Sequence, residues 1–205
     1  MRLTELWRKS VERILSRVDR LTHTRARARA RRRSARRGQP RRIVVTCYGN
    51  ICRSPYAAAT LRRKLDQAGL HDVVVESAGL YGPDRPAHEQ AAALARARGL
   101  DLGLHRSRLF DESDAADADL VLAMTRSHRG VFIRQFGVPA GRIELLGDFD
   151  VDDPPYREIA DPYGRDVAEF ERVFDQIERA VDGLASGWGG VAARSSGVSG
   201  SKPPA

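Results

Sequence analysis

The sequence predicts an α/β protein, a three-layer doubly wound sandwich built on a four-stranded parallel sheet. Two observations predict this fold. Between residues 41 and 185, short β-branched runs alternate with stretches of helical periodicity, the pattern of parallel strands joined by crossover helices. The first predicted strand leads into a short loop and a helix that begins at Pro55, which is where open α/β sheets bind their ligands.

Each element is indicated by its own pattern. Consecutive β-branched and apolar residues predict strands at residues 43–46, 73–76, 120–124 and 143–146. Helices are expected at residues 55–67, in the alanine-rich stretch ended by Gly99, between the third strand and Phe136, and at residues 166–184. The last helix has one apolar stripe, formed by Val167, Phe170, Phe174, Ile177, Val181 and Leu184. The acidic run from Asp111 to Asp119 is interpreted as a helix start with a solvated face.

Length and cysteine content limit the class of protein. A chain of 205 residues fits one globular domain with tails. No stretch approaches the roughly 18 apolar residues that span a bilayer, so we do not expect an integral membrane protein. Two cysteines, Cys47 and Cys52, are too few for a disulfide scaffold or a four-thiolate zinc site. We therefore expect a reducing, cytoplasmic location and a chemical use of the thiol.

The net charge of +8 is unevenly distributed along the chain. Residues 1–42 carry 16 Lys and Arg against three acidic residues, whereas the remainder carries 19 against 24. We predict a basic tail at residues 1–40, a catalytic domain at 41–185, and a disordered tail at 186–205 tethered at most by Trp188. The basic tail combines an amphipathic helix at residues 3–21 with an arginine-rich run at 22–42, interpreted as a mobile linker because like charges repel.

The loop after the first strand has the composition of an anion-binding nest. Backbone N–H groups of such a loop can point inward at the positive end of the following helix, and Gly49 and Asn50 tolerate the left-handed backbone that this requires. A cysteine at the mouth of the nest would have its thiolate favoured by those groups and by a nearby arginine. The predicted phosphate-binding residues are Tyr48, Gly49, Asn50, Ile51, Cys52, Arg53 and Ser54, with Cys47 as the nucleophile.

Three further residues complete the predicted chemistry. Arg53 offers a planar fork for two phosphate oxygens, and Ser54 could donate a hydrogen bond to the Cys47 sulfur. A thiolate that attacks phosphorus must expel an oxygen, and poor leaving groups need a proton donor. Asp161 is the candidate donor because Pro162 stiffens its loop and Tyr163 offers a flat wall for a ring. The rival acids, Asp152 and Asp153, also lie close to a proline.

These segments together resemble the low-molecular-weight protein tyrosine phosphatase family. The motif C-x5-R-S-P follows a strand, a distal D-P-Y precedes the last helix, and SAG, HRSR and LAMT lie between them, so the resemblance covers about residues 43–185. It implies that Cys47 forms a phosphocysteine, that Arg53 and the loop bind phosphate, and that Asp161 is the general acid and base. It further implies that Asn50, Ser77 and His105 support the loop. No metal or other cofactor is implied.

The resemblance leaves two questions open. A second loop cysteine, matched by Cys52, forms a reversible disulfide with the nucleophile in relatives, and a simple packed thiol is the alternative here. A related branch removes phosphate from arginine and typically has threonine where this chain has Ile51, which favours phosphotyrosine. The segment 119–128 nevertheless looks closer to that branch, and only Ile51, Tyr81 and Tyr163 are available as a substrate wall.

Other classes of protein fit the sequence less well. An arsenate reductase would need cysteines downstream of Cys52, and none exists. A catalytically idle phosphopeptide-binding module is disfavoured because a nucleophile, an arginine and an acid are all present. The expected partner is therefore a phosphorylated protein. Residues 1–42 could in addition contact an anionic membrane or a nucleic acid, and a solvated tail without a ligand is the alternative.

Overall fold

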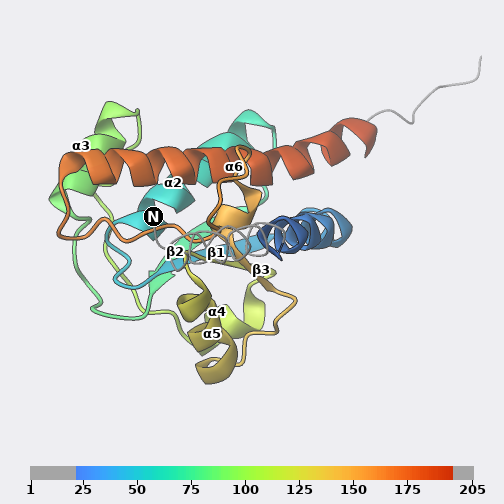
Figure 1. Ribbon diagram of the computed structural model, residues 1–205, viewed down its shortest axis with the longest axis horizontal. Coiled ribbons are helices and arrows are strands. Elements are labelled where there is room, and N and C mark those ends of the chain that lie inside the picture. Colours follow the sequence, from blue (N-terminus) through green and yellow to red (C-terminus); the bar gives the residue numbers. More distant parts are fainter. Residues whose placement is uncertain (1–21, 196–205) are drawn as a thin grey trace, which may run out of the picture.

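The computed structural model describes residues 22–195 and shows the predicted three layers (Figure 1). The central sheet is parallel, with the strand order β2-β1-β3-β4. Its strands are β1 (Arg42–Cys47), β2 (Val74–Gly79), β3 (Leu120–Ala123) and β4 (Ile143–Leu145). On one face lie α2 (Arg53–Gln67), α3 (Glu89–Ala97) and α6 (Val167–Ser195), and on the other α4 (Glu112–Asp117) and α5 (Arg126–Gln135).

The strand order positions the loop after β1. The chain leaves β1 for β2 on one side and later returns to β3 on the other side of β1, so the crossovers diverge at the carboxyl ends of β1 and β3. Open α/β sheets bind ligands at such a switch point. The second strand is longer than residues 73–76, because Ser77 pairs with Val45 and Gly79 pairs with Cys47. The fold class predicted from the sequence is confirmed.

Two apolar cores flank the sheet because its strands alternate their side chains between the two faces. Ile43 and Val45 face α2 and α6, whereas Val44 faces the α4–α5 layer. In the larger core, Tyr56 of α2 stacks on Phe174 of α6 with ring centroids 3.7 Å apart. The α2–α6 pair therefore covers one face of the sheet and holds α2, the helix that begins directly after the loop that follows β1. The chain then reaches the short 3₁₀ helix η1 (Leu146–Phe149) after β4.

The last helix does not end at residue 184, and the prediction of disorder from residue 186 is wrong for residues 186–195. Trp188 lies one turn beyond Leu184 on the same stripe and is only 1% exposed. Burying an indole outweighs the roughly 1 kcal/mol by which each glycine weakens a helix. Residues 196–205 lie outside the described residues. No helix between residues 22 and 195 is long and apolar enough to cross a bilayer.

The arginine-rich run is also ordered, which corrects the prediction of a mobile linker. Residues 22–37 are helical, and we call them the arginine helix. Arg33 makes a bidentate ion pair with the buried Glu144, with both N–O distances 2.6 Å, and Arg31 donates to the backbone oxygen of Asp150 at 2.8 Å. Arg27 is 3% exposed and donates to the backbone oxygen of Tyr156 at 2.7 Å. These carboxylate and carbonyl acceptors, which belong to the rest of the fold, compensate the positive charge of an arginine run whose like charges would otherwise repel one another.

The predicted amphipathic helix at residues 3–21 lies outside the described residues. The arginine helix ends shortly before β1 and packs on the rest of the fold. The change from a basic to an acidic composition near residue 42 is thus not a boundary of the folded unit.

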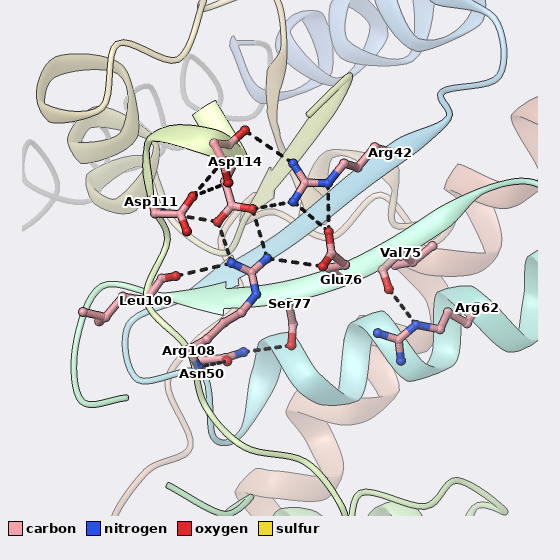
Figure 2. Close-up of polar contacts among 11 residues, drawn as sticks. Arg42, Asn50, Arg62, Val75, Glu76, Ser77, Arg108, Leu109, Asp111 and Asp114 are labelled. Atoms are coloured by element: carbon pink, nitrogen blue, oxygen red, sulfur yellow. Dashed lines mark hydrogen bonds and ion pairs between the residues drawn. The ribbon is translucent and has the colours of Figure 1, made fainter. Parts of the chain in front are cut away.

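The acidic run at residues 111–119 contains a buried carboxylate, which corrects its interpretation as a solvated face. Asp111 and Asp114 form a reciprocal capping box at the start of α4. Figure 2 shows that Asp114, fully buried, accepts hydrogen bonds from both Arg42 and Arg108, at distances of 2.6–3.0 Å. Arg42 also donates to Glu76 of β2 at 2.8 Å. One buried carboxylate thus ties α4 to β1, to β2 and to the segment that carries Arg108.

Replacing Asp114 by Asn should destabilise the protein by about 3 kcal/mol, because two arginines lose the charge that compensates them. Urea unfolding followed by circular dichroism measures this change. Asp117→Asn, an exposed position on the same helix, is the matched control and should change the free energy of unfolding by less than about 0.5 kcal/mol. Equal effects of the two substitutions would contradict the structural role given to Asp114.

Candidate active site

A pocket of about 190 Å³ opens at the carboxyl end of β1. The loop at residues 47–54, which we call the phosphate loop, forms its floor, and segments that follow β2 and precede α6 form its walls. The lining residues are Cys47, Tyr48, Gly49, Ile51, Cys52, Arg53, Tyr81, Arg85, Asp161 and Tyr163. The structure therefore brings the predicted nucleophile, arginine, acid and wall residues to one place.

The Cys47 sulfur receives two hydrogen-bonding groups from the phosphate loop. The backbone N–H of Asn50 donates to it at 3.2 Å, and the hydroxyl of Ser54 lies 3.0 Å away. Ser54 Oγ accepts from the Asn50 side chain at 2.9 Å, and its own proton can point to the sulfur or to the backbone oxygen of Ala78, which lies 3.5 Å away. The sulfur thus lies within hydrogen-bonding distance of one backbone N–H and one hydroxyl, and the role of Ser54 in stabilising the thiolate stays a prediction.

Asn50 is the residue around which the loop turns. Its φ of 51° lies in the left-handed region, which asparagine tolerates better than most residues. Its side chain is completely buried and donates to the hydroxyls of Ser54 and Ser77, each at 2.9 Å. Its amide oxygen accepts from the backbone N–H of Arg108 at 3.0 Å, as Figure 2 shows. The Arg42–Asp114–Arg108 network is thus linked directly to the phosphate loop.

His105 supports the same residue from the other side. Its Nε2 lies 2.7 Å from the backbone oxygen of Asn50, and a carbonyl can only accept, so Nε2 must carry the proton. Burial lowers the pKa of His105, which favours the neutral ring. Gly79 also approaches closely, because a Cβ there would lie 2.9 Å from the backbone nitrogen of Asn50. The three support residues predicted from the sequence, Asn50, Ser77 and His105, are therefore in contact.

Arg53 is a buried cation whose Nε donor has no partner among the described residues. Its guanidinium is 3% exposed, donates to the backbone oxygen of Ile159 at 3.2 Å, and forms an ion pair with Asp161. Its Nε has no partner among residues 22–195 although it is buried. A buried N–H without a partner is costly, so the site favours an oxygen-rich anion that would accept from Nε and a terminal nitrogen together.

Asp161 is half-exposed in the wall of the pocket. One carboxylate oxygen binds Arg53, and the other accepts from the backbone N–H of Tyr163 at 3.2 Å. The rival acids do not line this pocket. Asp152 lies 3.0 Å from Arg179, and Asp153 lies 2.8 Å from Arg31. Of the three candidate acids, only Asp161 is placed beside Arg53.

The walls of the pocket are aromatic and apolar. Tyr81 stacks on Tyr48, with ring centroids 5.6 Å apart and planes inclined by 12°. Tyr163 is 62% exposed and meets the edge of His88 with centroids 5.4 Å apart. Ile51, a residue of the phosphate loop, also lines the pocket. The opening of the pocket is therefore bordered by aromatic rings and one aliphatic side chain.

Sequence reasoning missed Arg85, which lines the pocket and fixes the wall. Its guanidinium donates at 2.8 Å to the backbone oxygens of Gly49, Tyr81 and Gly82, and it lies 5.5 Å from the centre of the Tyr81 ring. Among 35 Lys and Arg, nothing in the sequence distinguishes this one. Only its place on the loop that follows β2 could have indicated it.

Cys52 differs from Cys47 in its surroundings. It is buried at the start of α2, and burial together with the nearby Cys47 raises its pKa to about 12. Cys52 is therefore a protonated thiol, and both cysteines are free. Within residues 22–195, no group of three or more His, Cys, Asp and Glu side chains is arranged to hold a metal ion. The chemically reactive or charged groups that line the pocket are the two cysteine sulfurs, the guanidinium groups of Arg53 and Arg85, and the carboxyl of Asp161.

Comparisons with known proteins agree with this geometry. The family model "Low molecular weight phosphotyrosine protein phosphatase" matches residues 42–199. The "Low molecular weight protein-tyrosine phosphatase A" of Mycobacterium tuberculosis is 38% identical over 149 residues, which are 71% of this chain and 90% of that protein.

Two solved structures are similar over most of the fold. The tyrosine phosphatase Wzb from Escherichia coli K30, in complex with sulphate, has a TM-score of 0.65 and 34% identity, covering 72% of this chain and 98% of that one. The YwlE arginine phosphatase from Geobacillus stearothermophilus has a TM-score of 0.65 and 29% identity, covering 80% and 100%. The family model and the relatives, together with the contents of the pocket, show that this chain belongs to the low-molecular-weight protein tyrosine phosphatase family and is a phosphatase of that family.

Proposed function

We propose that this enzyme hydrolyses phosphotyrosine in proteins, with Cys47 as nucleophile, Arg53 as phosphate binder and Asp161 as general acid and base. The observation that carries the proposal is the lining of the pocket that contains the Cys47 sulfur, because three tyrosines and the apolar side chain of Ile51 contribute to it. A phenyl ring can pack against such a wall. The phosphate would then reach the backbone N–H groups of the loop and the unused Nε of Arg53.

The first half-reaction moves the phosphoryl group to sulfur. The Cys47 thiolate attacks phosphorus, the S–P bond forms and the P–O bond to the ring breaks. Asp161 in its acid form gives its proton to the leaving phenolic oxygen. Arg53 binds two equatorial oxygens and stabilises the charge that is redistributed in the transition state.

The ion pair between Arg53 and Asp161 must open for this step. In the structure Arg53 donates to the same carboxylate that has to serve as acid. A bound phosphate dianion competes for the guanidinium, so one oxygen of Asp161 is released toward the leaving group. The hydrogen bond from the N–H of Tyr163 to the other oxygen keeps the carboxylate in the pocket during this exchange.

The second half-reaction restores the enzyme. Asp161, now a carboxylate, takes a proton from water while that water attacks phosphorus and the S–P bond breaks. The products are inorganic phosphate and the Cys47 thiolate. The hydroxyl of Ser54, 3.0 Å from the sulfur, stabilises the thiolate as a leaving group. No cofactor takes part in either step as proposed.

Phosphoarginine is the second candidate substrate. A relative named "Protein-arginine-phosphatase" from Geobacillus stearothermophilus is 32% identical over 151 residues. Against this candidate, Ile51 places a hydrocarbon side chain where a hydroxyl would have to accept from a guanidinium. Leaving a buried guanidinium N–H without an acceptor is costly, so Ile51 favours the aryl ester.

Partners and location follow from the proposed reaction. The family implies a phosphorylated protein substrate. We propose a cytoplasmic enzyme because the nucleophile must stay reduced, and both cysteines are free thiols. Whether Cys52 protects Cys47 through a reversible disulfide stays a prediction, as does contact of residues 1–42 with an anionic membrane or a nucleic acid.

The substrate assignment is tested with two phosphorylated peptides of one sequence. We expect kcat/KM for the phosphotyrosine peptide to exceed that for the phosphoarginine peptide by about 100-fold or more, since the apolar wall discriminates against an unpaired polar group. Ile51→Thr should narrow this ratio by restoring an acceptor. Equal or reversed rates in the unchanged protein would overturn the assignment without affecting the family membership.

The acid assignment is tested by Asp161→Asn. With a peptide phosphotyrosine the substitution should lower kcat by roughly 100-fold or more, and with an activated aryl phosphate by much less, because a good leaving group needs no proton. Asp152→Asn is the matched control, since its carboxylate pairs with Arg179 outside the pocket. If Asp161→Asn behaves like the unchanged enzyme with both substrates, another group is the acid.

A further inference from the structure

The arginine helix presents two faces with different surroundings. Its inner face is bound to the body through Arg27, Arg31 and Arg33. Its outer face carries a second row of arginines at helical spacings, which we call the arginine stripe. The stripe consists of Arg25, Arg29, Arg32 and Arg36.

The arginine stripe is exposed and uncompensated. All four side chains are exposed, and none has an acidic or carbonyl partner within the part of the chain that the structure describes. Spacings of three and four residues make them neighbours on one helical face, where like charges repel. From Arg25 to Arg36 the row extends about 16 Å at 1.5 Å per residue. The contacts of the inner face hold this repelling row in place.

An extended row of arginines is complementary to a polyanion. Lipid headgroups and nucleic acid backbones both present phosphate, so the charge alone does not choose between them. The shallow hollow along the stripe contains Ala28 and also Arg33, which is already paired with Glu144. A second hollow brings Arg29 near Glu144 and Asp148, but both carboxylates are buried and already paired, with Arg33 and Arg157. Among the described residues, the hollow along the stripe therefore contains no acidic side chain that would oppose an anionic surface.

The chain that leads into the stripe identifies the occupant. Residues 3–21 place Leu, Trp, Val and Ile at spacings of three and four with Arg and Lys between them. That composition is typical of segments that lie at the surface of a bilayer, with apolar side chains below the headgroups and basic side chains among them. A nucleic acid backbone offers no counterpart for such a row of apolar residues. The sequence therefore favours a lipid surface over a nucleic acid.

We propose that the arginine stripe is a docking surface for the anionic face of a lipid bilayer. Docked in this way, the helix brings a domain whose remaining residues carry net negative charge close to a surface that would otherwise repel it. The inner face joins the helix to the segment at residues 150–156, so the whole phosphatase domain follows the helix to the surface.

Vesicle binding by the full chain tests the proposal. The probes are phosphatidylcholine vesicles with and without phosphatidylserine, and duplex DNA of arbitrary sequence, at low and at physiological salt. The unchanged chain should bind the anionic vesicles, more weakly as salt rises, and should bind the neutral ones much less. The triple variant Arg29→Gln, Arg32→Gln and Arg36→Gln should bind anionic vesicles about 100-fold more weakly.

A second triple variant controls for net charge. Arg96, Arg106 and Arg134 are exposed outside residues 1–42. The side chains of Arg96 and Arg134 have no partner among the described residues, and Arg106 donates only to the backbone oxygen of its neighbour His105. Changing these three to Gln removes the same charge and should cost far less vesicle affinity. Both variants should keep the unchanged kcat for a soluble aryl phosphate, which separates this proposal from the proposed function.

Three outcomes would overturn the proposal. The first is equal vesicle binding by the two triple variants, and the second is binding of the unchanged chain to neutral vesicles as tightly as to anionic ones. The third is tighter binding to duplex DNA than to anionic vesicles at physiological salt, with loss of DNA binding in the stripe variant. That last result would assign the stripe to a nucleic acid instead.

Discussion

The left-handed turn at Asn50, held by four hydrogen bonds, is the constraint on which the rest of the site depends. Asn50 uses both side-chain amide protons, its side-chain oxygen and its backbone oxygen. The partners are Ser54 of α2, Ser77 of β2, and Arg108 and His105 of the segment between α3 and α4. The backbone N–H of Asn50 is left to face the Cys47 sulfur at 3.2 Å. If the turn relaxed, the backbone N–H of Asn50 would no longer point at the Cys47 sulfur, and the loop would no longer direct its N–H groups toward the anion site at the start of α2.

Charged networks around the body extend that constraint outward. Arg108 gives its backbone N–H to Asn50 and its side chain to the buried Asp114, so the loop is linked through one residue to α4, β1 and β2. At the other side of the fold, Arg33 compensates the buried Glu144. Buried carboxylates are tolerated only with such partners, which makes the arginine helix part of the folded unit rather than an appendage. Arg25, Arg29, Arg32 and Arg36 of the same helix have no such partner among the described residues.

The sequence was sufficient where the signal is local, and insufficient where it depends on contacts through space. Hydrophobic periodicity predicted the strands and main helices, and the C-x5-R-S-P motif predicted the phosphate loop, because each is written within a few residues. The sequence does not predict that residues 22–37 form an ordered helix, because the acceptors that bind Arg27 and Arg33 lie more than a hundred positions away in the chain. For the same reason the sequence does not single out Arg85 and predicts a solvated Asp114, although residues distant in sequence hold both side chains in place. Trp188 is buried in the larger core, whereas the glycine-rich sequence around it predicts disorder.

The central claim is that the Asn50 side chain, and not merely its backbone conformation, keeps the phosphate loop ready for a phosphate dianion. Asn50→Gly tests it most directly, because glycine adopts positive φ without strain and removes only the side-chain hydrogen bonds. We expect kcat/KM for an aryl phosphate to fall by about 100-fold, and inhibition by orthophosphate to weaken in parallel, because Ser54, Ser77 and the backbone N–H of Arg108 lose their bonds to the side chain. Asn50→Gly with unchanged kcat/KM and unchanged phosphate inhibition would show that backbone conformation alone holds the loop, and would contradict the account.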